Sequence, residues 1–359
     1  MNLDKASEIA LETWIGRAQE PGAIVGILQR GSVISWNAIG FATMDRTAEH
    51  LGLQSVFYVA SLAKQFTGAC AALAEDADML RGQDQIRKYL PELSVAFDGV
   101  TIEQLLHHTA GTPKADPLAA ALGLPVTWWD GRGLWDLIAV LKDAPALAAP
   151  PGLRHAYSNE GYWLLAAAIE RASSVSFTSF ARDRLFAPLR MYSSRFRDDP
   201  YAPQPNLVDG HAGGAGGLRK VQTHFHGVGD GGLLTNLEDL AQWDLFWSGN
   251  SALGPSIPAR LRKGGCLKDG SRITYGWGVS VRLHRGLTII SHGGNYIGFL
   301  AKFVRFPDAD LSVACLANRD DVNVDAIARD LADMALGDAL DHMQPSWAET
   351  YREDARADV

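Results

Sequence analysis

A serine and a lysine three residues apart, Ser61 and Lys64, form the first pair of side chains in this chain that can do chemistry together. A serine hydroxyl is a weak nucleophile until a base takes its proton, and a lysine amine with a lowered pKa can be that base. Residues three apart lie on one face of a helix, so the hydroxyl and the amine would stand side by side. The unpaired N–H groups at the helix N-terminus would stabilise an oxyanion formed by serine attack. The alternative is a plain helix cap at Ser61 and a solvated Lys64.

A tyrosine and an asparagine in a second segment suit the same chemistry. Tyr157 and Asn159 follow a Pro-Pro-Gly loop and come just before a predicted helix. The phenol of Tyr157 can pass a proton, and the carboxamide of Asn159 can hold an amine or a substrate carbonyl. The alternative is that Ser158 or Asn159 caps the helix.

A third segment, Ser-His-Gly-Gly-Asn at residues 291–295, ends one predicted strand and leads toward the next. Paired glycines at a strand edge would let the backbone of a substrate approach closely. A main-chain N–H there can bind the same oxyanion as the N–H of Ser61. The alternative is a Gly-Gly hairpin turn with an incidental histidine.

The element that must position Ser61 is a helix predicted from Ser61 to Leu80. Its apolar residues recur at steps of three and four, the pattern of an amphipathic helix: Leu62, Phe66, Ala69, Leu73, Ala77 and Leu80.

Strands are predicted at both ends of the chain, with a helical middle from residue 58 to about 247. Residues 22–31 and 33–42 form a hairpin, later strands cover 273–283, 287–292, 299–306 and 311–317, and a helix follows at 324–336. This order predicts an α/β (α+β) fold with an antiparallel sheet built from both chain ends, flanked by helices, and an inserted all-helical lobe. The predicted domains are a sheet lobe of residues 1–60 and 255–345, a mainly helical lobe of 61–254, and a tail of 346–359. Ser61 would lie at the cleft between the lobes.

The composition is that of an ordinary globular protein, with 47% hydrophobic and 21% charged residues among 359. A net charge of -8 argues against nucleic acid or an anionic membrane as a partner. The chain starts directly with a helical pattern and contains no run of 18 apolar residues, so a cytoplasmic location is expected. Cys70, Cys266 and Cys315 form no C-x-x-C pair and are expected to be buried.

Taken together in this order, the three segments resemble those of the penicillin-recognising serine hydrolases. That superfamily includes class C β-lactamases, D-Ala-D-Ala carboxypeptidases, D-aminopeptidases, D-amino acid amidases and certain carboxylesterases. Residues 105–111, Leu-Leu-His-His-Thr-Ala-Gly, and the stretch 229–240 also resemble family motifs. The likeness covers roughly residues 20 to 318, and it implies the β-lactamase/transpeptidase-like form of the predicted fold.

The resemblance implies that Ser61 forms an acyl-enzyme, that Lys64 and Tyr157 share the proton transfers, and that no metal or organic cofactor takes part. The substrate would be a small molecule or a short peptide. The residues implied to bind the substrate and its oxyanion are Asn159, His292, Gly293, Gly294 and Asn295.

One departure from the family pattern bears on the substrate. The β-lactamases and carboxypeptidases usually carry Lys-Thr-Gly where this chain has His292, Gly293 and Gly294. A fixed cation and a hydroxyl would recognise a substrate carboxylate, whereas a histidine is mostly neutral at pH 7 and glycine has no hydroxyl. The sequence therefore favours a D-aminopeptidase, amidase or esterase. A β-lactamase or DD-carboxypeptidase, and a non-catalytic sensor or binding protein, are the alternatives.

His211, His224 and His226 lie in a Gly-rich stretch, and the His-x-His pair at 224 and 226 suggests zinc, but no clear third or acidic ligand accompanies that pair. They are expected to line the cleft or face solvent. Trp128 and Trp129 fit the walls of a substrate pocket, with simple packing as the alternative.

Overall fold

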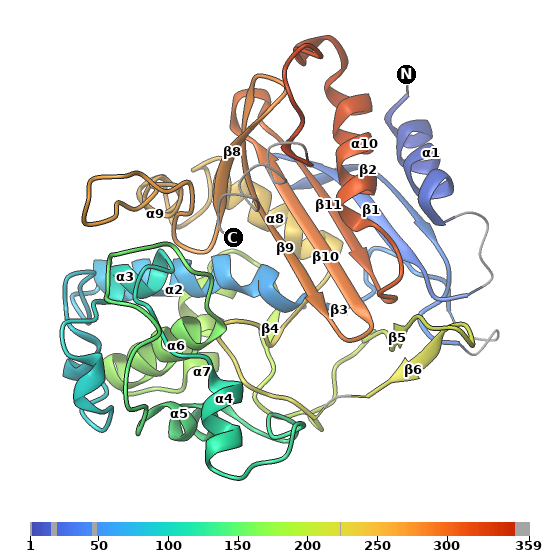
Figure 1. Cartoon of the computed structure of the whole chain (residues 1–359). Coiled ribbons are helices and arrows are strands. Elements are labelled where there is room, and N and C mark those ends of the chain that lie inside the picture. The colour runs from blue at the N-terminus through green and yellow to red at the C-terminus, as the bar shows by residue number, and fades with distance from the viewer. Residues whose placement is uncertain (1, 16–19, 45–48, 223, 349–359) are drawn as a thin grey trace.

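A six-stranded antiparallel sheet forms the centre of the computed structural model, which describes residues 2–15, 20–44, 49–222 and 224–348 (Figure 1). The strand order is β2-β1-β11-β10-β9-β8, so both chain ends contribute to one sheet. The strands are β1 (Ala23–Gln29), β2 (Ser32–Ile39), β8 (Ser280–His284), β9 (Leu287–Tyr296), β10 (Phe299–Phe306) and β11 (Leu311–Ala317). The predicted antiparallel sheet built from both chain ends is confirmed.

Helices cover both faces of this sheet. The helices α1 (Leu3–Ile15) and α10 (Val324–Leu336) pack on one face, and α8 (Leu237–Trp247) packs on the other (Figure 1). Every residue of β11 is buried, because a central strand between two helical layers has no solvent-facing side. The antiparallel strands β1 and β11, which come from the two ends of the chain, are paired in a register that sets Val25 opposite Cys315.

The turn between β1 and β2 consists of Arg30 and Gly31, whose φ angles are 51° and 82°. Two consecutive positive φ angles are typical of the tight turns that match the twist of a hairpin. The predicted hairpin is therefore present. In contrast, the predicted strand over 273–283 is too long, because only Ser280–His284 is a strand.

The part of the chain between β2 and β8, which is inserted into the sheet, is mainly helical. It contains α2 (Lys64–Asp76), α3 (Ile102–Leu106), α4 (Ala115–Ala121), α5 (Leu134–Leu141), α6 (Asn159–Ser173), α7 (Phe177–Ala181), α8 and α9 (Ser256–Leu261). Two small sheets accompany these helices, one of β3 (Phe57–Tyr58), β7 (Leu233–Thr235) and β4 (Arg195–Phe196), the other of β5 (Gly210–Ala212) and β6 (Arg219–Val221). The domain boundaries at residues 60 and 254 stay a prediction.

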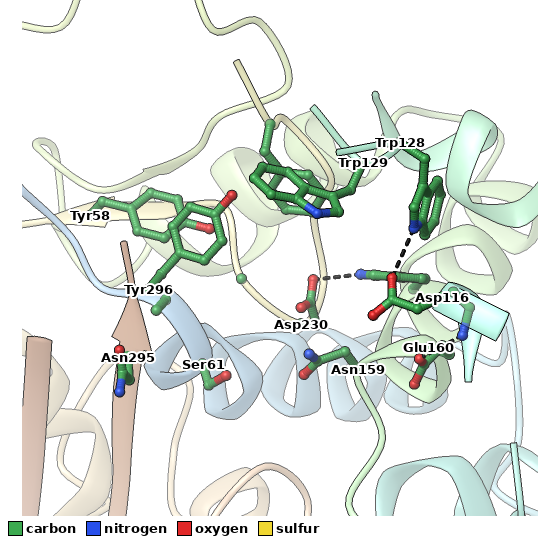
Figure 2. Close-up of a pocket in the computed structure, with 15 residues that line it drawn as sticks. Tyr58, Ser61, Asp116, Trp128, Trp129, Asn159, Glu160, Asp230, Asn295 and Tyr296 are labelled. Carbon is green, nitrogen blue, oxygen red and sulfur yellow. Dashed lines mark hydrogen bonds between the residues drawn. The ribbon is translucent and has the colours of Figure 1, made fainter. Parts of the chain in front are cut away.

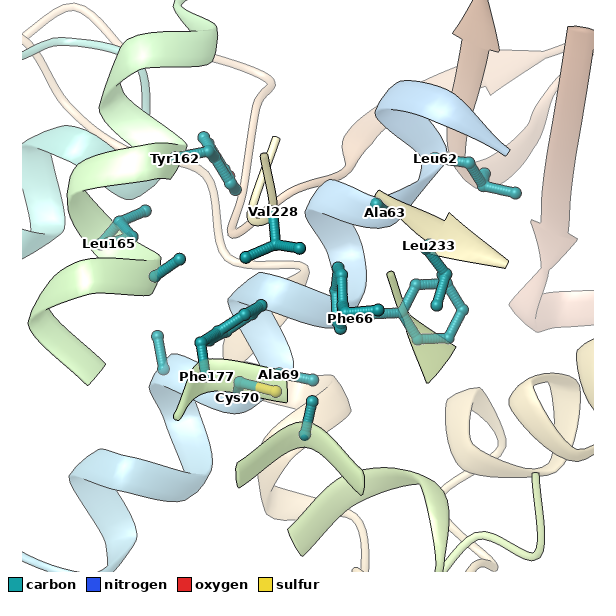
Figure 3. Close-up of a cluster of buried hydrophobic side chains, with 14 of the residues drawn as sticks. Leu62, Ala63, Phe66, Ala69, Cys70, Tyr162, Leu165, Phe177, Val228 and Leu233 are labelled. Carbon is teal, nitrogen blue, oxygen red and sulfur yellow. The ribbon is translucent and has the colours of Figure 1, made fainter. Parts of the chain in front are cut away.

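Helix α2 runs through the middle of the helical part. Its residues Phe66, Ala69 and Cys70 lie in a cluster with apolar side chains of α6 and α7 (Figure 3). The ring of Phe66 also stacks on Trp243 of α8, with 4.1 Å between centroids. Packing on several sides fixes the position of the N-terminal end of α2, where Lys64 lies.

Two details differ from the sequence predictions. Cys266 is exposed, whereas Cys70 and Cys315 are buried as predicted. Trp347, placed in the predicted tail, is only 4% exposed and packs on His284 with 4.4 Å between ring centroids. The remainder of that tail, residues 349–359, lies outside the described residues. Among the described helices, none is both long enough and apolar enough to cross a membrane.

Candidate active site

Ser61 lies just after a sharp turn that leads from β3 into α2. Ala60 has a φ of 46°, a left-handed conformation that few residues other than glycine adopt. Residues Ala60–Ala63 form a 3₁₀ turn, η1, and the α-helix begins only at Lys64. The predicted helix is therefore present as α2, but Ser61 precedes its α-helical part and the helix ends at Asp76 rather than at Leu80. The Ser61 side chain caps neither element and instead lines a pocket.

Lys64 is fully buried and points its amine at three oxygen atoms. Its Nζ lies 3.1 Å from Ser61 Oγ, 2.9 Å from Asn159 Oδ1 and 2.8 Å from the main-chain oxygen of Asp230. The oxygens of Asn159 and Asp230 can only accept hydrogen bonds. A neutral amine can donate to both of them and present its lone pair to the hydroxyl of Ser61. The geometry therefore suits an amine that takes the serine proton.

Asn159 is the first residue of α6, and its neighbour Ser158 is the cap of that helix. The Ser158 hydroxyl accepts a hydrogen bond from the Gly161 N–H at 3.1 Å. The capping alternative thus applies to Ser158, which leaves the Asn159 carboxamide free to hold the Lys64 amine.

The aromatic ring of Tyr157 lies beside the amine of Lys64. The Lys64 Nζ lies 4.8 Å from the centroid of the Tyr157 ring, which also contacts the His108 ring at 4.4 Å. Tyr157 is 41% exposed, and its hydroxyl makes no hydrogen bond to any described residue. The structure therefore places the phenol beside the amine without a hydrogen bond between them.

His292, Gly293, Gly294 and Asn295 lie inside β9, so the Gly-Gly hairpin alternative is wrong. A Cβ atom on Gly294 would come within 2.0 Å of the Val59 main-chain oxygen. Only glycine permits this approach, which presses β9 against the turn that carries Ser61. Asn295 lines the same pocket as Ser61 (Figure 2).

The imidazole of His292 has internal partners on both nitrogens. Its Nδ1 lies 2.6 Å from the Gly293 carbonyl oxygen, which can only accept, so Nδ1 carries the proton. Nε2 then accepts a hydrogen bond from the Tyr275 hydroxyl at 3.0 Å. Burial lowers the pKa of His292 to about 3. His292 is consequently neutral at pH 7 and has no nitrogen free for a substrate carboxylate.

Asp230 is a site residue that the sequence analysis did not single out. Besides its main-chain contact with Lys64, its Oδ1 accepts a hydrogen bond from the Trp163 indole at 2.6 Å. Burial raises the pKa of this carboxyl group. Asp230 lies in the stretch 229–240 that resembles a family motif, but no spacing rule links its side chain to Ser61.

A pocket of about 210 Å³ opens beside Ser61 (Figure 2). It is lined by Tyr58, Ala60, Ser61, Ala115, Asp116, Trp128, Trp129, Asn159, Glu160, Trp163, Phe225, Asp230, Gly231, Asn295 and Tyr296. Both tryptophans suggested as pocket walls are present, whereas Tyr157 and His292 are outside this lining.

The histidines considered for zinc have other contacts. His211 Nδ1 lies 3.0 Å from the Asn318 main-chain oxygen, and His224 lies beside Asp130. Within the described ranges, no group of three or more His, Cys, Asp or Glu side chains is arranged to hold a metal ion.

Comparison with known proteins places this geometry in context. The family model described as Beta-lactamase matches residues 11–338. The chain is 27% identical over 349 residues to Penicillin-binding protein 4* of Bacillus subtilis, covering 89% of this chain and 73% of that protein. It is 24% identical over 352 residues to a D-aminopeptidase of Cereibacter sphaeroides, covering 97% of this chain and 66% of that protein.

The fold also matches a solved structure. An octameric penicillin-binding protein homologue from Pyrococcus abyssi superposes with a TM-score of 0.80 at 22% identity, covering 94% of this chain and 78% of that one. This likeness concerns the fold. The chain spans 58% to 66% of the length of the D-aminopeptidases that it matches.

Proposed function

This chain belongs to the beta-lactamase family of serine hydrolases, and on that premise we propose that it cleaves amide or ester bonds of small molecules or short peptides through an acyl-enzyme on Ser61. The observation that carries this proposal is the contact between Lys64 Nζ and Ser61 Oγ at 3.1 Å. The other two contacts of the amine, with Asn159 and Asp230, hold it in the orientation that proton transfer needs.

In the first step, Ser61 Oγ attacks the acyl carbon while Lys64 Nζ takes its proton. The oxyanion is stabilised by the main-chain N–H groups of Ser61 and Asn295. Two observations support this pair: the Ser61 N–H donates no hydrogen bond within the described part of the chain, and Gly294 lets β9 lie directly against η1.

In the second step, the leaving group departs with a proton passed from Lys64 through Tyr157, and water then releases the acid. The position of the Tyr157 ring, 4.8 Å from Lys64 Nζ, supports this path. Its hydroxyl has no hydrogen-bond partner among the described residues and is free to meet a leaving group.

The leaving group carries no free carboxylate beside β9, because His292 is neutral and both of its nitrogens have internal partners. That argues for a D-aminopeptidase-like, amidase-like or esterase-like activity and against β-lactams. The match to D-aminopeptidases at 24% identity supports the same branch. A cytoplasmic location stays a prediction.

A substrate panel tests the proposal. It contains p-nitrophenyl esters, D- and L-aminoacyl p-nitroanilides, amino acid amides and nitrocefin. We expect turnover of esters or aminoacyl amides, and slow or no turnover of nitrocefin. Fast nitrocefin turnover would favour the β-lactamase alternative. Absence of turnover together with an unacylated Ser61 would favour a binding protein.

A further inference from the structure

The segment that carries Tyr157 is held on both sides by one residue, His108. The main-chain oxygen of His108 accepts a hydrogen bond from the Ala156 N–H at 2.8 Å, and its Nδ1 accepts one from the Ser158 N–H at 3.1 Å. The imidazole ring itself lies 4.4 Å from the Tyr157 ring, measured between centroids. His108 therefore contacts the residue before Tyr157, Tyr157 itself and the residue after it.

The ring of His108 is in turn packed among aromatic side chains whose positions are fixed. The rings of Tyr275 and Tyr162 lie 4.6 Å and 5.0 Å from it, measured between centroids. The hydroxyl of Tyr275 donates to His292, and the hydroxyl of Tyr162 donates to a main-chain oxygen of α3 at 2.9 Å. Since His108 is also buried, its ring has little freedom to move and can hold the neighbouring phenol in one position.

Two features of His108 are unfavourable by themselves. Its φ of 56° lies in the left-handed region, at a position just after α3 where glycine is favoured. Because Nδ1 accepts the hydrogen bond from Ser158, the ring proton is on Nε2, and this buried N–H makes no hydrogen bond to any described residue. A glycine would avoid the first cost and a phenylalanine the second, but neither has an acceptor for the Ser158 N–H.

Burial keeps this acceptor available. It lowers the pKa of His108 well below the ordinary value of a histidine, so the ring is neutral at pH 7 and the lone pair of Nδ1 stays free to accept.

Asn159 and Lys64 are held independently of His108. Asn159 is the first residue of α6, which has its own cap, and its carboxamide bonds to Lys64 Nζ at 2.9 Å. Tyr157 precedes that helix. Its main-chain oxygen accepts from Lys114 Nζ at 2.9 Å, but the side chain of this lysine is 57% exposed, which makes it a weak anchor. Loss of the acceptor on His108 would therefore displace Tyr157 more than the serine-activating amine.

We propose that His108 is a positioning residue, which through Nδ1 and its ring holds the phenol of Tyr157 where it can pass a proton to the leaving group. The inference rests on the proposed function, in which Tyr157 protonates the leaving group, and adds the residue on which the position of Tyr157 depends. His108 is not among the residues that line the pocket beside Ser61, so its effect reaches the substrate through Tyr157.

The test compares two leaving groups on the same acyl group. A p-nitroanilide must receive a proton as its amine departs, whereas p-nitrophenolate is stable enough to leave without one. The quantity measured is kcat/KM for the p-nitroanilide divided by kcat/KM for the p-nitrophenyl ester. Because both values come from one preparation, this amide-to-ester ratio does not depend on the amount of folded protein.

Three variants of His108 separate the hydrogen bond from the bulk of the ring. His108→Asn places an amide oxygen near the position of Nδ1, His108→Gln places it near the position of Nε2, and His108→Phe keeps a ring without an acceptor. We expect the ratio to fall about tenfold or more in the Gln and Phe variants, as for a misplaced catalytic group, and to stay within about threefold of the wild type in the Asn variant.

The adjacent histidine provides a matched control. His107 is also buried, and its Nδ1 bonds to the main-chain oxygen of Tyr275 rather than to the segment that carries Tyr157. His107→Phe makes the same chemical change one residue away, and it should leave the amide-to-ester ratio unchanged.

Tyr157→Phe provides the reference, since it removes the proton donor itself. A lower ratio in Tyr157→Phe without one in His108→Gln or His108→Phe, or an equal fall in the Asn and Phe variants of His108, would overturn the inference and leave the proposed function intact. An unchanged ratio in Tyr157→Phe, with Ser61 still acylated, would overturn the proton path and this inference with it. An unlabelled Ser61 in the active-site labelling of the wild type would overturn the proposed function itself.

Discussion

At the scale of single residues, the environment of Lys64 explains how a buried cation-forming group is tolerated. A buried amine without partners is costly, and here three oxygens surround Nζ at 2.8 to 3.1 Å. Two of these oxygens are permanent acceptors, so they orient the amine before any substrate binds. Preorganisation of this kind avoids rearranging the site during the reaction.

The neutral state of His292 leads to a pH prediction. Its pKa in the folded protein, about 3, is lower than the ordinary value near 6.5 of an unfolded chain. Between these values the unfolded chain binds more protons, so the free energy of unfolding falls as the pH falls from 6.5 toward 3. The contribution of this one group has a slope of up to about 1.4 kcal/mol per pH unit.

The comparison of wild type with His292→Gln isolates this contribution, since glutamine does not titrate. Urea unfolding at several pH values between 4 and 8 should show a stability difference that is constant above pH 6.5 and shifts in favour of the variant below it. A difference that stays constant down to pH 4 would contradict the neutral, internally bonded histidine.

The sequence was informative about residues whose chemistry depends on local spacing. Ser61 and Lys64 were found because residues three apart share a helical face, and the observed contact has that origin. Asp230 was missed because it acts on Lys64 through a main-chain oxygen, brought there by tertiary packing from 166 residues away. Its side-chain type carries no signal of that contact.

At the scale of elements, the site depends on how closely β9 approaches η1. The Cβ atom of an alanine at 294 would lie 2.0 Å from the Val59 main-chain oxygen, and backbone cannot give way as a flexible side chain can. Gly294→Ala should therefore destabilise the protein by about 1–3 kcal/mol, as overpacking does. It should also lower kcat by about 10²-fold by moving Asn295 relative to Ser61.

The neighbouring glycine provides a matched stability control. At position 293 the nearest contact of an added Cβ would be 3.5 Å, which is ordinary van der Waals distance. Thermal unfolding should show Gly293→Ala close to the wild type and Gly294→Ala clearly lower. Equal stability of the two variants would contradict the close approach.

Elements with a regular pattern were predicted well. The boundaries of β10, β11 and α10 match the predicted ranges, because alternating or continuous apolar residues end at clear Gly, Asp or Pro signals. The region 273–279 was misread as strand. Gly278 there approaches the Lys64 main-chain oxygen so closely that a Cβ would lie at 2.3 Å, which is a tertiary requirement that local sequence does not display.

At the scale of the whole molecule, the inserted helical part is tied to the sheet by a buried ion pair. Asp244 of α8 pairs with Arg305 of β10 and accepts a hydrogen bond from Ser312 of β11 at 2.6 Å. Both charged side chains are almost fully buried. Removing one partner leaves a buried charge without its counter-ion.

Asp244→Asn should therefore lower the free energy of unfolding by about 3 kcal/mol, the lower end of the range for broken buried pairs, since Arg305 keeps its pairing with Asp310. The exposed Asp308→Asn, on the turn that follows β10, is the matched control and should change stability by less than about 0.5 kcal/mol. Chemical unfolding of both variants checks this. An Asp244→Asn variant as stable as Asp308→Asn would show that the pair does not hold α8 to the sheet.

The overall topology could be predicted because strands at both chain ends have few ways to form one sheet around a helical insertion. The small sheets β3-β7-β4 and β5-β6 were missed, since strands of two or three residues carry too little pattern to be recognised. The β3–β7 pair nevertheless bears on the proposed active site, because it anchors the chain just before Ser61.

The most direct test of the central claim is covalent labelling of Ser61 by a fluorophosphonate, followed by intact mass measurement and peptide mapping. We predict a single adduct on the peptide that contains Ser61, none in Ser61→Ala, and labelling slowed by about 10²–10⁴-fold in Lys64→Met, the usual contribution of a general base. The exposed Lys142→Met should label at the wild-type rate. An adduct on another residue, or a Lys64→Met variant that labels as fast as the wild type, would contradict a serine activated by the neighbouring lysine.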